Sequence, residues 1–510
     1  MRWHFTICVQ VGSIRSVFYN SRRIAMASNK EGIVSGGIGF LSRATVQFLL
    51  FGVTIVATRQ LSISEFGSYA LASLFLIVAR ALFYVGPYEY LLKTPHTPSL
   101  YSTCLRANII LAAAISCLLA LVYLIAFRMF ETNDVSRLIA LLAPSIFLVA
   151  ITAWYEAVLL RDLRVRRYYL STLIGDCIGA ALAVFLLLKG YGVVSLVAQT
   201  YARLLILFIL YAIGTTHRPA LGHGWTHVRE VFLWSKERYY AVLLNFSSTY
   251  GADVVLGILL SPAATGLYRA SSRIVSTLTD LFAQPLQKIS QTNLSARLVR
   301  EKSLDSSWLT MLSGVGAIGW AGLITLAFLA DDLVPLALGE KWTPAVPIVV
   351  SFCAVKSFML LDAVTTSFLV CHDRQKQMLR VQICVALAVI MLSWFVAPFG
   401  PVWVAIAVGC ATATMSLIYG AMVLKLSKAG AEAIFDMIKT SAPPVIGTVL
   451  ALTLFDQLLP DLPREQAVFW GLIAAATGSM TGAFIVRTRI LTAIGSLGHL
   501  PDAKPSRVAP

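Results

Sequence analysis

The sequence predicts an all-α polytopic membrane protein. We expect about 14 transmembrane helices, arranged as two six-helix lobes in a parallel pseudo-twofold repeat, plus two extra C-terminal helices. Apolar stretches close to the ~20 residues that cross a bilayer follow one another along the chain. Charged residues make up only 13% of the chain, against about 25% in a soluble domain. The loops alternate between basic and nearly uncharged, as loops on opposite sides of a membrane do.

The hydropathy of each stretch places the individual spans. The first lobe is expected to hold spans 35–58, 66–88, 104–127, 135–160, 171–189 and 192–214. The second lobe is expected to hold spans 236–259, 265–290, 306–330, 342–371, 378–398 and 401–426. The two additional helices are expected at 441–457, the shortest span, and at 465–487. Pro344 and Pro347 predict a bend at the start of the tenth span, because proline interrupts helical hydrogen bonding.

The distribution of lysine and arginine predicts the orientation. Most of them fall before the first span, in the even-numbered loops and after the last span, so these segments are expected to be cytoplasmic. Both termini are then inside, in a bacterial inner membrane. The expected organisation is a cytoplasmic segment 1–34, a first lobe 35–214, a cytoplasmic linker 215–235, a second lobe 236–426, two helices in 427–487 and a cytoplasmic tail 488–510. Residues 1–25 are expected to be dispensable, because Met26 opens a segment that leads directly into the first span.

An internal repeat supports the division into two lobes. Leu61-Ser62 aligns with Leu260-Ser261, and Gly67-x-Tyr69 aligns with Gly266-x-Tyr268 at the same offset. Each segment is the short outer turn after the first span of its lobe. Six spans separate the two turns, so the repeat is parallel, with its axis along the membrane normal.

Several classes of function are excluded or disfavoured. The net charge of +16 lies mainly in the cytoplasmic loops, so no nucleic-acid partner is expected. The cysteines show no paired or C-x-x-C spacing, so neither a disulfide framework nor a metal site is predicted, and no cofactor is expected. The phosphate-binding motif G-x-x-x-x-G-K-[ST] is absent, and no loop is long enough for a catalytic domain. The sequence therefore favours transport over an enzyme.

Four segments resemble a known family. They are ATRQLSISEFGSYALA, LLSPAATGLYRASSRIVSTL, LLRDLRVRRYYLSTLIGDCIGA and KGYGVVSLVAQTYARLLILF. They resemble turns of the bacterial polysaccharide (Wzx-type) oligosaccharide flippases of the multidrug/oligosaccharidyl-lipid/polysaccharide exporter superfamily. The resemblance implies flipping of an undecaprenyl-pyrophosphate-linked oligosaccharide between leaflets, for exopolysaccharide or lipopolysaccharide biosynthesis. It implies membrane lipids, and a polysaccharide polymerase with export machinery, as partners.

Charged residues within the spans are the candidate site. Arg43, Arg80, Arg203 and Arg273 lie at depths that suit a water-filled cavity, where guanidinium groups could bind a pyrophosphate. The arginines of lipid II flippases resemble Arg43, Arg80 and Arg273 in helix and approximate depth. Asp253 and Asp280 are candidates for ion coupling. The alternative for each is an ion pair with a neighbouring helix, and local ion pairing is the expected role of Glu156 and Asp176.

Three rival functions stay open. A multidrug or cation antiporter of the same superfamily predicts an acidic cavity in the first lobe, but the first two spans hold no carboxylate before Glu89. A membrane polymerase or ligase of glycan assembly predicts a large outer loop, which is missing. A flippase for the peptidoglycan precursor differs only in its cargo.

Overall fold

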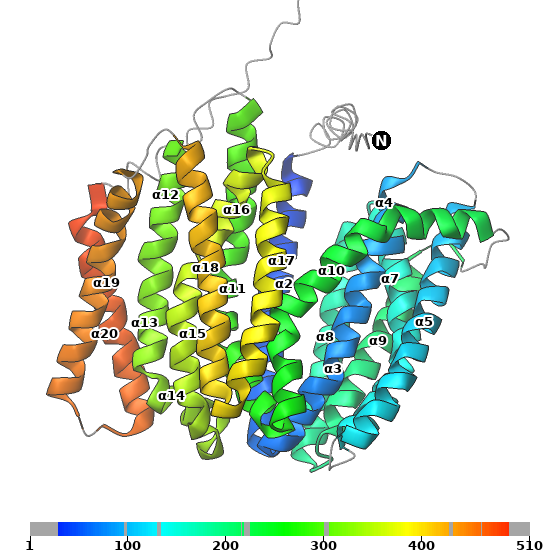
Figure 1. The fold of residues 1–510 in the computed structure, drawn as a ribbon, viewed down its shortest axis with the longest axis horizontal. Helices are drawn as coiled ribbons and strands as arrows, with labels where there is room; N and C mark the ends of the chain where they lie inside the picture. Colours follow the sequence, from blue (N-terminus) through cyan, green and yellow to red (C-terminus); the bar gives the residue numbers. More distant parts are fainter. Residues whose placement is uncertain are drawn as a thin grey trace, which may run out of the picture.

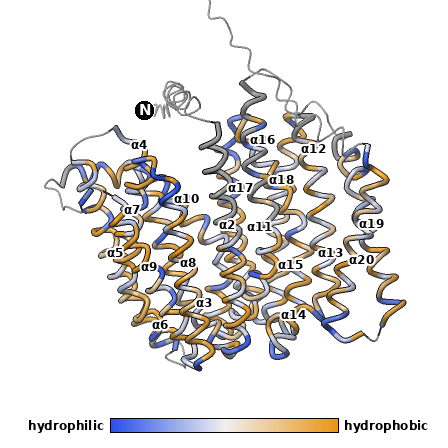
Figure 2. Tube along the Cα trace, turned by 180° about the vertical axis from the view of Figure 1, so that it is seen from behind, coloured by the Kyte–Doolittle hydropathy of each residue, from blue (hydrophilic) through white to orange (hydrophobic). Residues whose placement is uncertain are grey.

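The chain forms two helical lobes with an additional hairpin beside the second lobe (Figure 1). The computed structural model describes residues 29–95, 99–129, 134–215, 217–218, 225–299, 305–427, 432–460 and 462–488. All regular elements within these residues are helices. Hydrophobic residues cover much of the length of peripheral helices, and hydrophilic residues gather toward the two ends of the bundle (Figure 2). This distribution is that of a multi-pass membrane protein.

The first lobe contains the helices before residue 215. They are α2 (Asn29–Gln60), α3 (Ile63–Phe83), the π-helical η1 (Tyr84–Tyr88), α4 (Glu89–Lys93), α5 (Leu100–Met129), α6 (Asp134–Leu142), α7 (Ser145–Arg161), α8 (Val165–Leu188) and α9 (Val194–Gly214). The polypeptide then enters the long helix α10 (Trp225–Leu259), which contacts α3, α5 and η1 of this lobe and α17 of the other. The linker expected at 215–235 is therefore helical from Trp225 onward.

The second lobe and the hairpin contain the remaining helices. They are α11 (Pro262–Val299), α12 (Asp305–Val315), η2 (Gly316–Trp320), α13 (Ala321–Phe328), α14 (Ala330–Leu338), η3 (Glu340–Ala345), α15 (Val346–Met359), α16 (Asp362–Cys371), α17 (Gln375–Val396), η4 (Ala397–Phe399), α18 (Pro401–Leu426), α19 (Glu432–Leu458) and α20 (Arg464–Ile485). Helices α19 and α20 pack against each other and against α12, α13 and α14, which confirms the expected pair of extra helices.

The number of spans agrees with the expectation. Twelve helices in the described residues are long and apolar enough to cross a membrane. Helices α2 and α11 fall outside this set, and together with it they give the expected series of about 14. The start of α2 and the end of α20 lie at the same end of the bundle (Figure 1), as an even number of crossings requires.

Several predicted spans are interrupted in the structure. Pro144 separates α6 from α7, because proline has no amide hydrogen and its ring crowds the preceding turn. In the second span, Gly86 adopts non-helical angles (φ −91°, ψ −108°) beside Pro87. The tenth span starts as the 3₁₀ helix η3, in agreement with the predicted bend, and breaks again at Leu360–Leu361.

The repeated turns are equivalent in structure as well as in sequence. The Ser62 hydroxyl accepts a hydrogen bond from the Glu65 amide (3.2 Å), and the Ser261 hydroxyl accepts one from the Ala264 amide (3.2 Å). Each serine therefore caps the N-terminus of its helix, α3 or α11. The two helices cross at Gly67 and Gly266, where a Cβ on Gly67 would lie 1.7 Å from the Pro262 carbonyl oxygen. Only glycine allows this approach, which defines the closed end of the bundle.

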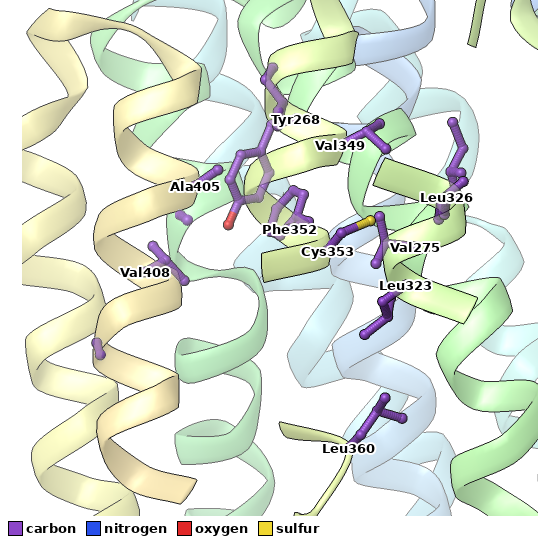
Figure 3. Close-up of a cluster of buried hydrophobic side chains, with 14 of the residues drawn as sticks. Tyr268, Val275, Leu323, Leu326, Val349, Phe352, Cys353, Leu360, Ala405 and Val408 are labelled. Atoms are coloured by element: carbon purple, nitrogen blue, oxygen red, sulfur yellow. The ribbon is translucent and has the colours of Figure 1, made fainter. Parts of the chain in front are cut away.

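The cores of the two lobes differ. In the second lobe Tyr268 packs edge-on against Phe352 (5.1 Å between ring centroids), among apolar side chains from α11, α13, α15 and α18 (Figure 3). The repeat-related residue of the first lobe, Tyr69, lines a cavity instead. The lobes diverge from the closed end toward the end that carries α4, which we call the open end (Figure 1).

Candidate functional site

The candidate site is a cavity of about 630 Å³ inside the membrane region. Its walls come from α2, α3, η1, α7, α8 and α9 of the first lobe and from α11 of the second. Phe66 and Ala57 line it toward the closed end, and Tyr84 and Tyr168 line it toward the open end. The cavity thus lies mostly in the first lobe and is completed by one helix of the second.

Two of the predicted arginines face this cavity without a carboxylate partner. Arg80 on α3 and Arg273 on α11 both line it, and neither has a carboxylate oxygen within 4.0 Å in the described part of the chain. The Arg80 guanidinium lies 5.3 Å from the centre of the Tyr84 ring, a cation–π distance. Glu156 lies within electrostatic range of Arg80 and Asp280 within that of Arg273, but neither carboxylate forms an ion pair with them, so both guanidinium groups can still donate hydrogen bonds to an anion that enters the cavity.

The third predicted arginine is already paired. Arg203 on α9 lines the cavity and forms an ion pair with Asp176 on α8. The Asp176 side chain is only 3% exposed, whereas that of Arg203 is 21% exposed. The expectation of a local ion pair for Asp176 is confirmed. Arg203 is held toward the cavity as half of a neutral pair rather than as a free cation.

Arg43, the fourth predicted arginine, and the candidate ion-coupling carboxylates have different surroundings. Arg43 belongs to α2, but its side chain lies outside the residues whose burial and contacts are described. Asp253 is buried and accepts a hydrogen bond from Arg269 (3.2 Å). Asp280 lies within electrostatic range of Lys356 and Arg273. The structure therefore brings Arg80, Arg203 and Arg273 to one cavity, whereas neither Asp253 nor Asp280 lines it.

Glu156 is a cavity residue that the sequence reasoning assigned wrongly. It accepts hydrogen bonds from the hydroxyl groups of Tyr84 and Tyr88 on η1, instead of forming the expected ion pair with the nearby arginine cluster. Arginines of that cluster bind backbone oxygens at helix ends, Arg161 that of Thr94 (3.0 Å) and Arg164 that of Gly214 (2.5 Å). Positive side chains commonly satisfy the last carbonyls of helices in this way.

Arg269 is a further cavity residue. It lies inside α11, lines the cavity and stacks 4.4 Å from the centre of the Tyr250 ring, and its pairing with Asp253 agrees with the alternative of an ion pair for that carboxylate. For the part of the cavity that α8 lines, the sequence does contain a periodic signal. Tyr168, Thr172 and Asp176 recur every four residues along an apolar span, which places them on one helix face.

Side-chain hydrogen bonds hold the closed end together. The Lys341 ammonium donates to the carbonyl oxygens of Arg59 (3.0 Å) and Leu61 (2.5 Å). The Trp342 indole donates to the Thr58 carbonyl (2.9 Å), and Arg59 donates to the carbonyls of Leu336 and Ala337. The end of α2 is thereby fastened to α14 and η3 of the second lobe, and the cavity is closed on this side.

Comparison with known proteins places this geometry in context. A family model described as polysaccharide biosynthesis protein matches residues 56–347. No curated protein matches the chain. Among solved structures, a lipid II flippase MurJ in an inward closed conformation has a TM-score of 0.71 at 14% identity, covering 90% of this chain and 100% of that one.

Two further solved structures are similar in fold. An inward-facing multidrug resistance MATE family transporter of the MOP superfamily has a TM-score of 0.58 at 13% identity, covering 76% of this chain and 96% of that one. A MOP superfamily transporter from Pyrococcus furiosus has a TM-score of 0.50 at 13% identity, covering 76% and 94%. At such identities the likeness concerns the fold, which confirms the expected two-lobe architecture.

Proposed function

We propose that this chain, which belongs to the polysaccharide biosynthesis protein family, is a transporter that flips an undecaprenyl-pyrophosphate-linked oligosaccharide from the inner to the outer leaflet. The cargo serves surface polysaccharide biosynthesis. The single observation that supports this proposal best is the pair Arg80 and Arg273, which face one intramembrane cavity from different lobes without a carboxylate partner among the described residues.

The chemistry of guanidinium groups connects this observation to the cargo. An arginine at the bilayer centre costs about 2.5–3.5 kcal/mol on insertion scales, so an anion that offsets the charges of Arg80 and Arg273 within a span would be stabilised in the cavity. A pyrophosphate offers several oxygens to the planar donors of arginine, which bind phosphate in a bidentate manner. Because Arg80 and Arg273 belong to different lobes, a bound pyrophosphate would also link the two bodies whose relative movement we propose.

The proposed movement is alternating access. The open end would face the cytoplasm, as the basic loops indicate, and would admit the headgroup while the lipid tail stays in the bilayer. The lobes then rock, the contact between Gly67 and Gly266 separates, and the headgroup leaves on the outer side. For this step Lys341 and Trp342 release the end of α2. The protein would lie in the inner membrane with both termini inside, close to a polymerase and export machinery.

A genetic experiment tests the proposal. A deletion strain is complemented with wild-type protein, Arg80→Ala, Arg273→Ala or Arg380→Ala, and surface polysaccharide and lipid-linked intermediates are measured. Arg380 is an exposed residue of α17 outside the cavity lining, so its variant controls for loss of positive charge. We expect the cavity variants to strand intermediates in the inner leaflet, while wild type and Arg380→Ala restore polysaccharide. Equal rescue by all four proteins would contradict the proposal.

A cation or drug antiporter remains the second candidate because two carboxylates line the cavity. Glu156 and Asp176 both belong to the first lobe, where the antiporter alternative predicts acidic residues. However, Asp176 is paired with Arg203 and Glu156 is bound by tyrosine hydroxyls. Normal polysaccharide in the deletion strain, together with altered sensitivity to cationic drugs, would favour the antiporter.

A further inference from the structure

One wall of the cavity, formed by α8 and α9, combines apolar side chains with polar groups that together carry no net charge. On α8 the side chains of Tyr168, Thr172 and Asp176 line the cavity at intervals of one turn. On α9 the residues that line it recur three or four positions apart; they are Leu196, Gln199, Thr200, Arg203, Leu204, Leu207 and Tyr211. Both helices therefore present one face to the cavity along much of their length.

Hydrogen bonds hold the groups of this wall in place. The hydroxyls of Thr172 and Tyr211 are 2.8 Å apart, and that of Tyr69 on α3 lies 3.3 Å from the hydroxyl of Thr200. Helices α8 and α9 pack closely behind the wall, since a Cβ on Gly179 would lie 3.1 Å from the Arg203 Cβ. These side chains are thus fixed before a ligand arrives, which reduces the entropic cost of binding.

The wall also contains a polar side chain with no protein partner. Gln199 lines the cavity one turn from Arg203, and its amide makes no hydrogen bond within the part of the chain that the structure describes. An amide offers both donors and an acceptor. The wall therefore holds the Gln199 amide and the Arg203–Asp176 pair one turn apart, which supply donors and acceptors without net charge.

We propose that this α8–α9 wall is a sugar subsite, which binds the sugar attached to the pyrophosphate and selects a neutral sugar. This inference rests on the proposed function. Sugar hydroxyls need paired donors and acceptors, which Gln199 and the Arg203–Asp176 pair supply, and the tyrosines supply apolar ring surface. The subsite differs in chemistry from the pyrophosphate subsite, where Arg80 and Arg273 form no ion pair within the described part of the chain.

The charge balance of the wall gives the selectivity. A sugar carboxylate would need an uncompensated cation, but Arg203, the cation on the described α8–α9 face, is already neutralised by Asp176. The carboxylate of Glu156, which lines the cavity from α7, would repel a further negative charge at short range. A neutral or N-acetylated sugar avoids both costs, so it is the expected neighbour of the pyrophosphate.

Binding measurements on the purified full chain in lipid nanodiscs test the subsite. The probes are undecaprenyl pyrophosphate, its N-acetylglucosamine conjugate and its glucuronic acid conjugate. We expect the neutral conjugate to bind wild type about 10-fold more tightly than the bare carrier, as a few net hydrogen bonds would give. Gln199→Leu should reduce this ratio to about two-fold. Gln457→Leu, at an exposed position outside the cavity lining, is the matched control.

A second variant tests the selectivity independently. Asp176→Asn leaves the Arg203 charge uncompensated, so the glucuronic acid conjugate should bind about five-fold more tightly than to wild type. The sugar subsite is refuted if Gln199→Leu and Gln457→Leu behave alike, or if wild type binds the acidic and neutral conjugates equally. Failure of the proposed function has a different signature: wild type does not bind the bare carrier, or Arg80→Ala binds it unchanged. Absence of binding to all three probes would overturn both proposals.

Discussion

Replacing Gly67 by alanine is expected to force the closed end open. The added Cβ would lie 1.7 Å from the Pro262 carbonyl oxygen and 2.9 Å from the Gly266 amide nitrogen. Ordinary carbon contacts lie about 3.5–4.0 Å apart, so α3 and α11 must separate by roughly 2 Å at their crossing. The atoms in the way are backbone, which cannot rotate aside. Overpacking of this kind costs about 1–3 kcal/mol, and every 1.4 kcal/mol changes a population ratio about 10-fold.

The population of the outward-open state can be measured by labelling. Ser73 lines the cavity, so Ser73→Cys, in a chain whose native cysteines are replaced by serine, reports access from outside. We expect Gly67→Ala to increase labelling by an externally added impermeant maleimide by about 5- to 150-fold. Gly420→Ala is the matched control, because its Cβ would meet no atom within 4 Å. Wild-type labelling in Gly67→Ala would refute the reasoning that this contact closes the cavity.

Three further changes test other contacts. Trp342→Phe removes the donor to the Thr58 carbonyl at a fully buried position. We expect this change to favour the outward-open state by about 1–3 kcal/mol, measured in the same labelling assay. Unchanged labelling would contradict this expectation. Arg464→Ala removes ion pairs with Glu340 and Asp332, but the arginine side chain is 45% exposed. The free energy of unfolding should therefore fall by less than ~1 kcal/mol. A larger loss, measured by thermal unfolding in detergent, would show that these ion pairs are not weak surface contacts. Gly478→Ala puts a Cβ 2.2 Å from the Gly447 carbonyl oxygen, so α19 and α20 should separate and the melting temperature should fall in the same assay; an unchanged melt would show that the hairpin adjusts freely.

Hydropathy predicted most of the fold because crossing a bilayer is a strong local constraint. Each span must satisfy its backbone hydrogen bonds internally, so its length and composition reveal it. The interruptions were harder to predict. Gly86 bends the second span where α10 packs closely, since a Cβ there would lie 2.0 Å from the Tyr239 hydroxyl. That cause lies in a contact between helices distant in sequence, which hydropathy does not contain.

The sequence could predict candidate site residues only from the depth of charged residues within the spans. Arg80 and Arg273 were chosen because a charge within a span needs polar surroundings; both line the cavity, and their binding role stays a prediction. The pairing of Arg203 with Asp176 depends on how α8 packs against α9, and the binding of Glu156 by Tyr84 and Tyr88 depends on the π-helical turn of the second span. Charge depth therefore identified candidate cations but could not distinguish free ones from paired ones.

The internal repeat distinguishes residues that join the lobes at the closed end from residues that line the cavity. Its shared residues are the capping serines and the crossing glycines, which all act at the closed end. Its tyrosines have diverged in role, since Tyr69 lines the cavity and Tyr268 fills the core of the second lobe. The two halves therefore share residues at the closed end, where the lobes contact each other, and differ at the cavity, where a ligand would bind. Changes at Gly67 or Gly266 should accordingly shift the balance of conformations, whereas changes at Arg80 or Gln199 should alter ligand affinity at a fixed conformation.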